Sequence, residues 1–389
     1  MKVGFISSSS FQNPGGIKSH ILNLHHEFEK RHISSKIIVP KRSNSESGAK
    51  YGKNVILVGT AFPIPFNASQ ADLSLYFNLL SLGKILRRER FDILHFHNFA
   101  FPSILEILSF SSATHILTLH FNPDGSDLLK NIPWFPAMVT KILNWKIHGI
   151  IAVSPVAMEI AKGYRGPKRI IPNGVNTDLF RPGTFPSSRS GSETLQGRTT
   201  GFKHGSPTLL FVGRLEKRKG LLFLLNAFLA LQKKYPKIRL FVVGEGEERK
   251  SCDRFIKKHA VKNVQFLGKK TDEELAQIYR QADIFCSPAL YGESFGIVLL
   301  EAMASGLPVV AFANRGYRQF LGGTKGEAGL VPVENIPMLI NTIDTMLANH
   351  LLRKELSEWG IKEAKQYSWQ TIADQILNFY QEVLQKKSS

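Results

Sequence analysis

The sequence has few cysteines and no long apolar run, and each absence excludes a class of protein. Its 2 cysteines, Cys252 and Cys286, are too few for a disulfide framework, so a reducing compartment is expected. No uncharged apolar run approaches the roughly 18–20 residues that cross a membrane. The most apolar helix candidate, 221–231, is too short, so a soluble or peripheral protein is expected.

Acidic residues are also scarce. The chain has 31 Asp and Glu against 50 Lys and Arg, which gives a formal net charge of +19. Such an excess favours a polyanionic partner: nucleic acid, an anionic membrane or a phosphorylated ligand. The charge divides into +9 for residues 1–180 and +10 for the rest, which argues against a basic tail. Hydrophobic and charged fractions of 43% and 21% are ordinary for a globular protein and exclude long disorder.

Short apolar strands alternate with helical segments along most of the chain. This alternation predicts parallel βαβ units, and therefore an α/β protein with two successive doubly wound Rossmann-like sheets. Thr271 is the expected N-cap of a helix over 271–281, with Glu274 completing a capping box. Strands are expected at 3–6, 36–39, 92–95, 115–119, 149–153, 209–213, 238–243, 264–267, 283–287 and 309–313.

One segment interrupts the alternation. Residues 184–206 are rich in Ser, Thr, Gly and Arg and have no periodicity, which indicates a linker or an insertion between domains. We therefore expect one domain over 1–183 and another over 207–366, with a final helix over 367–389 packing back toward the first domain. Ligands of such sheets bind at the carboxyl ends of the strands, so a cleft between the domains is the predicted site.

The segment 213–220 directly follows a predicted strand and opens a helix. Gly213 is expected to let the backbone turn sharply there. Arg214 and Lys219 place two cations at the rim of the strand ends, where they suit a pyrophosphate. The alternative is a solvated basic turn.

Two carboxylates with seven residues between them, Glu293 and Glu301, flank the start of another predicted helix. Gly296 allows close approach of the backbone, and the amides near Gly296, Ile297 and Val298 form a helix N-terminus that can bind an anion. Glu301 lies about one turn inside and can accept hydrogen bonds from diol hydroxyls. The alternative is a solvated face of the helix.

The first domain offers a glycine loop and several histidines. Gly15 and Gly16 follow the first strand, where they permit a phosphate or a sugar to come close, although a Gly-Gly pair is often only a turn. His120 ends an apolar strand and should emerge at the cleft, and His95 and His97 alternate at another strand end. No acidic or cysteine spacing supports these histidines as metal ligands, so no metal site is predicted. Asp-x-Asp is absent from the sequence, which weakens a mechanism based on a metal-chelated diphosphate.

With these residues the chain resembles the retaining glycosyltransferases of family 4, which have the two-domain GT-B architecture. The first half is most similar to the bacterial phosphatidylinositol mannosyltransferases, through segments 14–20, 63–67, 91–97 and 102–103. The likeness covers nearly the whole chain and rests on Pro14-Gly15-Gly16, residues 171–176, Gly213-Arg214 with Lys219, Gly244-Glu245-Gly246, Glu293 with Glu301, and Tyr367-Ser368-Trp369.

The resemblance implies a role for each matching residue. It implies Arg214, Lys219, Glu293 and His120 as catalytic residues. It implies that the donor is bound by Gly16, Gly213, Arg214, Lys219, Glu293, Phe295, Gly296, Ile297, Val298 and Glu301. It implies acceptor contacts from Gly15, Lys18, Asn67 and His120.

The resemblance also implies the substrates. The donor is expected to be a nucleotide sugar, GDP-mannose first and a UDP-sugar next, and the acceptor a lipid or polyol such as phosphatidylinositol. No tightly bound cofactor is expected, and the cations take the place of a metal in stabilising the leaving diphosphate.

Residues 72–90 are expected to form an apolar helix with a cationic end, which either lies on an anionic bilayer or packs in the core. The expected location is cytoplasmic, peripheral to the inner face of the membrane. A nucleic-acid binder lacks a recognition motif here, and a non-catalytic sugar-nucleotide module would not need Glu293 or Lys219.

Overall fold

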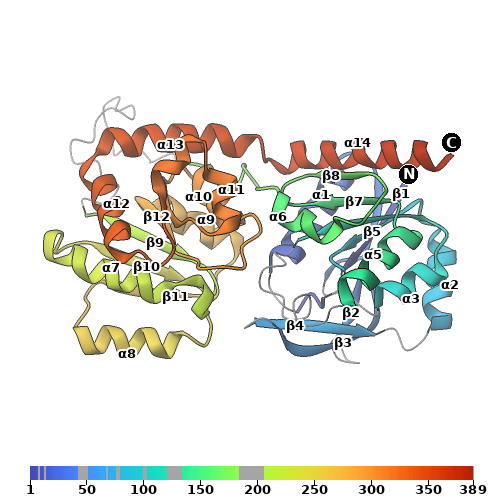
Figure 1. Ribbon diagram of the computed structural model, residues 1–389, viewed down its shortest axis with the longest axis horizontal. Coiled ribbons are helices and arrows are strands. Elements are labelled where there is room, and N and C mark those ends of the chain that lie inside the picture. Colours follow the sequence, from blue (N-terminus) through green and yellow to red (C-terminus); the bar gives the residue numbers. More distant parts are fainter. Residues whose placement is uncertain are drawn as a thin grey trace. The chain divides into compact units, whose positions relative to one another are not determined.

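The computed structural model describes the chain except for residues 8, 13–14, 43–50, 67–68, 76–78, 100–102, 121–133, 184–205 and 389. The chain forms two compact units: unit 1 is residues 1–174 with 369–389, and unit 2 is residues 175–368. Each unit has a largely parallel sheet with helices between its strands (Figure 1). The predicted α/β class with two doubly wound sheets is confirmed, whereas the predicted linker 184–206 lies, except for Ser206, outside the described residues.

Unit 1 contains an eight-stranded sheet in the order β4-β3-β2-β1-β5-β6-β7-β8. All neighbours are parallel except β3 and β4, so the neighbouring strands β1, β5, β6 and β7 end at a common edge. Every residue of β5, β6 and β7 is buried, as expected for strands covered on both faces. The strands are β1 (Lys2–Ser7), β2 (Ser34–Lys41), β3 (Val55–Phe66), β4 (Ser69–Leu75), β5 (Ile93–His97), β6 (Thr114–Leu119), β7 (Gly149–Ala152) and β8 (Lys168–Ile170).

The expected single helix over 72–90 is wrong. Its first residues, 72–75, belong to β4, which pairs antiparallel with β3, and among the described residues of the segment the helix is Leu79–Glu89, α2. The local sequence Asp-Leu-Ser-Leu alternates polar and apolar residues, which suits a strand. Asp72 then accepts hydrogen bonds from Ser10 N and Arg42 Nη2, at 2.8 and 2.6 Å, and these contacts hold the hairpin against the rest of unit 1.

The last helix, α14 (Trp369–Ser388), completes unit 1 and contacts α1 (Figure 1). Its buried residues include Ile372, Ile376, Phe379 and Tyr380, a spacing that gives an α-helix one apolar face. The other helices of unit 1 are α1 (Gly16–Lys30), α2 (Leu79–Glu89), α3 (Ser103–Phe110), α5 (Phe135–Lys146), α6 (Pro155–Met158) and the 3-10 turn η3 (Glu159–Ala161).

Unit 2 contains a fully parallel six-stranded sheet in the order β11-β10-β9-β12-β13-β14. Its strands are β9 (Thr208–Val212), β10 (Arg239–Val243), β11 (Val264–Gly268), β12 (Ile284–Ser287), β13 (Val309–Phe312) and β14 (Leu330–Val331). Its helices are η4 (Lys217–Lys219), α7 (Leu221–Lys234), α8 (Arg249–His259), α9 (Asp272–Gln281), α10 (Ile297–Ala304), α11 (Arg315–Leu321), η5 (Lys325–Gly329), α12 (Ile336–Ala348) and α13 (His350–Lys365).

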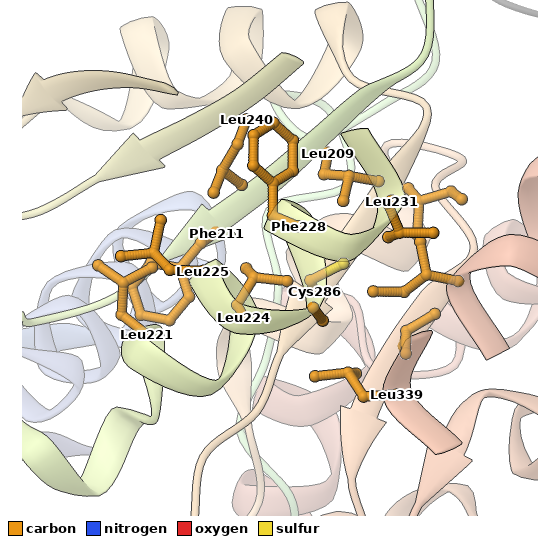
Figure 2. Packing of buried hydrophobic residues seen from close by; sticks show 14 of the residues in the cluster. Leu209, Phe211, Leu221, Leu224, Leu225, Phe228, Leu231, Leu240, Cys286 and Leu339 are labelled. Atoms are coloured by element: carbon orange, nitrogen blue, oxygen red, sulfur yellow. The ribbon is translucent and has the colours of Figure 1, made fainter. Parts of the chain in front are cut away.

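The apolar segment 221–231 is a core helix. Leu224, Leu225 and Phe228 of α7 are fully buried in one cluster with side chains of β9, β10, β12 and α12 (Figure 2). Burial of each such side chain contributes about 1.5–3 kcal/mol, which explains why so apolar a helix belongs in the core. None of the described helices combines the length and the hydropathy needed to cross a membrane.

Two further details fix the frame of unit 2. The predicted capping box is confirmed: Thr271 Oγ1 accepts from Glu274 N, and Glu274 Oε2 accepts from Thr271 N. Val175 N donates to Tyr367 O at 2.8 Å, so the two chain segments that enter and leave unit 2 are paired. The two units therefore meet at residues 174–175 and 368–369 of the chain. The sequence predicted that the first domain ends at residue 183 and the second at residue 366.

Candidate functional site

In unit 1, two histidines meet at the carboxyl ends of neighbouring strands. His97 is the last residue of β5, and His120 directly follows β6, its parallel neighbour. His97 Nδ1 and His120 Nε2 are 3.0 Å apart, and the two rings are stacked. A hydrogen bond between two imidazoles needs a proton on one nitrogen and a lone pair on the other. The bond therefore links the tautomers of the two rings.

His20 and Asn173 join this pair, and we call His20, His97, His120 and Asn173 the imidazole cluster. His20 lies on α1, with its ring edge-on to His120 at a centroid distance of 4.7 Å. Its Nδ1 donates to Asn173 Oδ1 at 3.0 Å, and Asn173 also hydrogen-bonds the His120 side chain. Because Nδ1 carries the proton, Nε2 of the neutral His20 ring has the lone pair, and this buried atom has no hydrogen-bond partner within the described part of the chain.

Burial keeps the imidazole cluster uncharged. It lowers the pKa of His20 to about 4, a shift that the hydrogen bond to Asn173 partly offsets. Burial, followed by repulsion from neighbouring imidazoles, lowers the pKa of His97 and of His120 well below the ordinary value. Since the charged form of a buried histidine loses its hydration, all three rings are neutral near pH 7. They act there through hydrogen bonds.

The sequence grouped His95 with His97 and His120, but the structure puts His20 in that place. His95 Nδ1 lies 2.6 Å from Tyr380 Oη and His95 Nε2 lies 2.6 Å from Thr118 Oγ1, so both nitrogens are used.

The ligand atoms of His20, His97 and His120 all lie within 4.8 Å of one another. A tetrahedral zinc site with bonds of about 2.0–2.1 Å needs nitrogens roughly 3.3 Å apart. A metal would have to draw the rings together and break their mutual hydrogen bonds, and its absence stays a prediction.

The glycine loop precedes these residues in unit 1. Gly15 is the N-cap of α1 and Gly16 its first residue, and a Cβ atom on Gly15 would meet nothing within 4 Å. Lys18 Nζ donates to Phe11 O at 2.7 Å and lies 5.7 Å from the ring centroids of Phe11 and Tyr51. Its ammonium is therefore held beside this loop. Of the predicted acceptor residues, Asn67 lies outside the described residues.

In unit 2, alternating charges form a continuous chain, which we call the ion-pair network. Arg214 Nη1 lies 2.7 Å from Glu216 Oε1, and Glu216 Oε2 lies 2.8 Å from Arg218 Nε. Arg218 Nη1 and Lys219 Nζ both donate to Glu293 Oε1, at 3.0 and 2.6 Å. The order is thus Arg214, Glu216, Arg218, Glu293, Lys219. The strands β9 and β12 pair directly, which brings Glu293 to the segment after β9.

The network keeps its charges although most of it is buried. Burial acts to raise the pKa of Glu293, but Lys219 and Arg218 outweigh it and hold that pKa below the ordinary value. The side chains of Glu293, Lys219 and Arg218 are only 12%, 15% and 12% exposed, whereas Arg214 is 49% exposed. Arg214 is thus the cation that an incoming anion can most easily reach.

At the carboxyl ends of β9 and β10, the position that only glycine can fill is Gly244 and not Gly213. Gly213 does not have a positive φ, and a Cβ atom there would sit 3.6 Å from its nearest neighbour, an ordinary contact. Gly244, after β10, has a φ of +126°, and a Cβ atom on it would lie 1.9 Å from Gly213 O. The backbone does bend at Gly213, as expected, but this bend does not require glycine, and the close approach that does is made by Gly244 at the neighbouring strand end.

Helix α10 begins beside the network. Its N-cap, Gly296, has a φ of +99°, and a Cβ atom there would lie 2.6 Å from the Tyr317 ring. Ile297 and Val298 are the first two helical residues, so their amides precede the first intrahelical bonds and face the helix N-terminus. The Phe295 ring is buried against the rings of Phe320 and Tyr367, and its contact with the donor stays a prediction.

Glu301, inside α10, has an unusual protonation state. Burial raises its pKa to about 8, while a hydrogen bond with Tyr279 partly opposes the shift. Tyr279 Oη lies 3.0 Å from Glu301 Oε2 and 3.2 Å from Val298 O. A tyrosine hydroxyl has one proton, so both contacts are satisfied if Tyr279 donates to Val298 O and a protonated Glu301 donates to Tyr279.

Comparison with known proteins supports the same division of the chain. Residues 14–179 match the family described as Glycosyltransferase Family 4, and residues 193–363 match Glycosyl transferases group 1. The phosphatidyl-myo-inositol mannosyltransferase of Mycobacterium leprae is 33% identical over 98% of this chain and 97% of its own length. The same-named protein of Mycolicibacterium smegmatis is 30% identical over 98% and 94%.

The chain belongs to the glycosyltransferase family of these mannosyltransferases. Solved structures show the shared GT-B fold: sucrose-phosphate synthase from Thermosynechococcus elongatus has a TM-score of 0.75 at 21% identity, covering 99% of both chains. Anabaena HepE in complex with UDP has a TM-score of 0.73 at 20% identity, covering 98% of this chain and 100% of HepE.

The family 4 match contains the whole imidazole cluster of this glycosyltransferase, and the group 1 match contains the whole ion-pair network. The sequence predicts Arg214, Lys219, Glu293 and His120 as site residues. It indicates no functional role for four residues that bind them. Glu216 and Arg218 stand in the same short segment as Arg214, and their alternation of charge was the available signal. The other two partners are His20 and Asn173. They lie in the family segments 14–20 and 171–176, but nothing in those segments indicates that the two side chains contact each other.

Proposed function

We propose that this protein is a retaining hexosyltransferase that moves α-mannose from GDP-mannose to phosphatidylinositol. The observation that carries the proposal is the ion-pair network at the carboxyl ends of β9 and β12, beside the N-terminus of α10. Cations and helix amides at such an edge suit a nucleotide diphosphate. The nearly full-length likeness to phosphatidyl-myo-inositol mannosyltransferases supports the choice of sugar and acceptor.

In this proposal unit 2 binds the donor. Arg214 and Lys219 bind the diphosphate together with the amides of residues 296–298. Glu301 takes the ribose diol, and its raised pKa lets it act there as donor or acceptor. Glu293 holds the sugar hydroxyls. Because Glu293 already binds Arg218 and Lys219, its carboxylate is fixed in direction before the sugar arrives.

In the proposed sugar transfer, negative charge develops on the leaving diphosphate. The bond from the sugar C1 to the diphosphate oxygen breaks, and a bond from C1 to the acceptor oxygen forms on the same face. The acceptor hydroxyl gives its proton to the leaving diphosphate, so no enzymic base is needed. Arg214 and Lys219 stabilise that diphosphate, and loss of one such donor typically lowers kcat by about 100–1,000-fold.

Unit 1 supplies neutral groups in the same proposal. His120 lines the sugar site as an uncharged imidazole, oriented by His97. The proposal assigns Gly16 to donor binding, and Gly15, Lys18 and Asn67 to the acceptor site. A neutral imidazole forms directed hydrogen bonds with hydroxyls and does not compete with Arg214 for the phosphate charge.

We also propose that the protein acts at the cytoplasmic face of an anionic membrane, through α2. Leu82 and Leu86 of this helix are buried, so its apolar stripe is used in the core. Its exposed face carries Leu80, which is 75% exposed, with Lys84 and Arg87. Such a face suits electrostatic attraction to anionic headgroups with one apolar contact.

A UDP-sugar donor is the second candidate. It is favoured by the structural likeness to Anabaena HepE, which is solved in complex with UDP and in complex with UDP-glucose. That likeness is at 20% identity, whereas the mannosyltransferase relatives are 30–33% identical over nearly the whole chain. GDP-mannose therefore stands first.

A donor panel tests the proposal. GDP-mannose, GDP, UDP-glucose, UDP and a nucleotide-free control are compared by thermal shift, donor hydrolysis and transfer to phosphatidylinositol. We expect GDP-mannose to give the largest shift and an α-linked mannolipid as product. Stabilisation by UDP-sugars alone would favour the second candidate, and no stabilisation by any nucleotide sugar would overturn the transferase.

Vesicle co-sedimentation tests the membrane surface. Binding is expected to rise with the fraction of anionic lipid and to fall for Lys84→Glu with Arg87→Glu. The matched control reverses two exposed cations of α13, Lys354→Glu with Lys362→Glu, and should bind as the parent does. Binding indifferent to anionic lipid would remove α2 as a membrane surface.

A further inference from the structure

Glu216 lies between Arg214 and Arg218 in the ion-pair network, and the alternation of charge is the one sign of this in its sequence context. It is 8% exposed, and its two carboxylate oxygens bind different arginines: Oε1 pairs with Arg214 and Oε2 with Arg218. A single 3-10 turn, η4, follows it. Glu216 N donates to Arg214 O, and Lys219 N donates to Glu216 O, which fixes the backbone on both sides of the carboxylate.

Arg218 is bound on two sides. Its Nε donates to Glu216 and its Nη1 to Glu293, and the side chain is 12% exposed. A guanidinium that uses both its Nε edge and an Nη group on carboxylates connects them rigidly, because its donors have a fixed planar geometry. Lys219 binds the same Glu293 oxygen. A continuous series of ion pairs within unit 2 therefore connects Arg214 through Glu216 and Arg218 to Glu293.

We propose that Glu216 is a positioning residue of the donor site, which orients Arg214 directly and Glu293 through Arg218. The proposal rests on the proposed function, because it assumes that Arg214 and Glu293 act on the donor. Glu216 itself does not touch the substrate in this scheme. Arg214 has five N–H donors, more than one carboxylate oxygen can use, so its pairing with Glu216 is compatible with binding a diphosphate.

Two physical effects make Glu216 suited to this task. An arginine side chain has many rotamers, and a half-exposed one such as Arg214 samples them unless a buried partner selects one. Glu216 also separates two guanidinium groups of like charge. The five side chains carry three positive and two negative charges, so the network keeps a net positive charge toward an anion while each cation stays in place.

The alternative is that Glu216 only stabilises the loop after β9. The two roles predict different results for Glu216→Gln, which keeps the shape and removes the charge. A positioning role predicts that kcat falls by about 10–100-fold, the scale expected when a catalytic group shifts by about 1 Å. It also predicts unchanged or tighter binding of GDP and UDP, because a negative charge near the anion is lost. A loop-stabilising role predicts weaker binding, lower kcat and a lower Tm together.

The first experiment measures kcat, KM and nucleoside diphosphate affinity for Glu216→Gln and Glu216→Asp. Glu216→Asp keeps the charge on a shorter side chain and should lie between the parent and Glu216→Gln. The matched control is Glu355→Gln, which removes an exposed carboxylate paired with a lysine far along the chain. A Glu216→Gln kcat within twofold of the parent would overturn the proposal, as would a joint loss of affinity and Tm.

The second experiment is a double-mutant cycle with Arg214→Ala. If Glu216 acts mainly through Arg214, then Glu216→Gln should change kcat by less than about threefold in the Arg214→Ala background, because interacting residues are not additive. Full additivity would overturn the assignment. Failure of the proposed function looks different, since the parent protein itself would then neither bind GDP or UDP nor turn over any sugar nucleotide, and the positioning role would fall with it.

Discussion

The imidazole cluster of unit 1 and the ion-pair network of unit 2 handle burial in opposite ways. Around His20, His97 and His120, burial lowers each pKa so far that the rings are neutral. Around Glu293, burial also disfavours charge, but Lys219 and Arg218 lie close enough to keep the carboxylate ionised. The difference is the supply of opposite charges, because the described contacts of the imidazole cluster include no carboxylate.

This difference indicates what each region can bind. Neutral imidazoles and an amide recognise hydroxyl groups by directed hydrogen bonds, and salt has little effect on them. A network with excess positive charge attracts an anion over several ångströms, and salt weakens that attraction. In the proposed function the imidazole cluster acts on sugar hydroxyls and the ion-pair network on a diphosphate. Four sets of variants test this division, in order of decreasing expected effect.

The largest effect is expected from removing charge in unit 2. Lys219→Ala and Glu293→Ala should each lower transfer by about 100–1,000-fold or more, because an electrostatic contact to the leaving group or the sugar is lost. Circular dichroism should show an intact fold. The matched control is Lys217→Ala, an exposed neighbour in the same segment, which should transfer at nearly the parental rate. Near-normal turnover of both Lys219→Ala and Glu293→Ala would end the assignment of this site.

A smaller effect is expected from His120→Ala in unit 1. A neutral hydrogen bond is worth about 0.5–1.5 kcal/mol, and an unsatisfied partner adds to the loss, so transfer should fall by about 10–100-fold. The ratio of parental to variant rate should be the same at low and high salt, whereas the ratio for Lys219→Ala should shrink as salt rises. His26→Ala, an exposed histidine of α1, serves as the control. A strong salt dependence for His120→Ala would show that the cluster does not act as a neutral site.

The sequence was sufficient to predict the elements that carry both regions. The alternation of strands and helices placed Arg214 and Lys219 after one strand and Glu293 after another, and strand ends are where such folds bind ligands. It could not show that β9 and β12 are neighbours, which is what joins Lys219 to Glu293. The run Glu216–Lys219 has the composition of a solvated turn, so only the fold reveals that Glu216 is buried and that the Arg218 side chain is only 12% exposed.

The imidazole cluster was harder to predict because its contacts are distant in sequence. His20 meets Asn173 across 153 positions, and His95 meets Tyr380 across 285. The sequence favoured His95 as the third histidine because it stands two residues from His97. In the structure both nitrogens of His95 already have partners on β6 and α14, so proximity in sequence gave the wrong member. Likewise, the single helix expected over 72–90 is wrong because residues 72–75 at its start pair with β3.

Acid should destabilise the protein through the imidazole cluster. The folded pKa values of these histidines lie below the unfolded value near 6.5, so the unfolded chain binds more protons as the pH falls. Their contribution to stability is complete above about pH 6.5 and is lost as the pH falls, toward about 4 in the case of His20. Each imidazole contributes a slope of about 1.4 kcal/mol per pH unit in that window.

Urea unfolding at pH 7, 6 and 5 measures this slope. His97→Gln should flatten the slope relative to the parent, even if it lowers the absolute stability at pH 7. The control His26→Gln removes an exposed imidazole instead of a buried one, and should leave the slope of stability against pH unchanged. A parental stability that stays constant from pH 7 to pH 5 would contradict neutral, buried imidazoles.

The smallest effect is expected from Glu301 in unit 2, and it has the opposite sign. Its folded pKa of about 8 lies above the unfolded value near 4.5, so its contribution is complete below about pH 4.5 and is lost as the pH rises toward 8. Glu301→Gln keeps a neutral group beside Tyr279 and removes the ionisation. The variant should therefore gain about 2–4 °C in Tm over the parent at pH 8 and differ little at pH 5.

Glu355→Gln, an exposed carboxylate of the same unit, should give parallel Tm curves across that range. Parallel curves for Glu301→Gln as well would mean that Glu301 is ionised in the folded protein. Its contact with Tyr279 would then be an ordinary charged hydrogen bond, and the ribose site would carry a negative charge near pH 7. A gain confined to alkaline pH instead leaves Glu293 as the ionised member of the carboxylate pair and Glu301 as the neutral one, so that unit 2 itself contains both ways of burying a polar group.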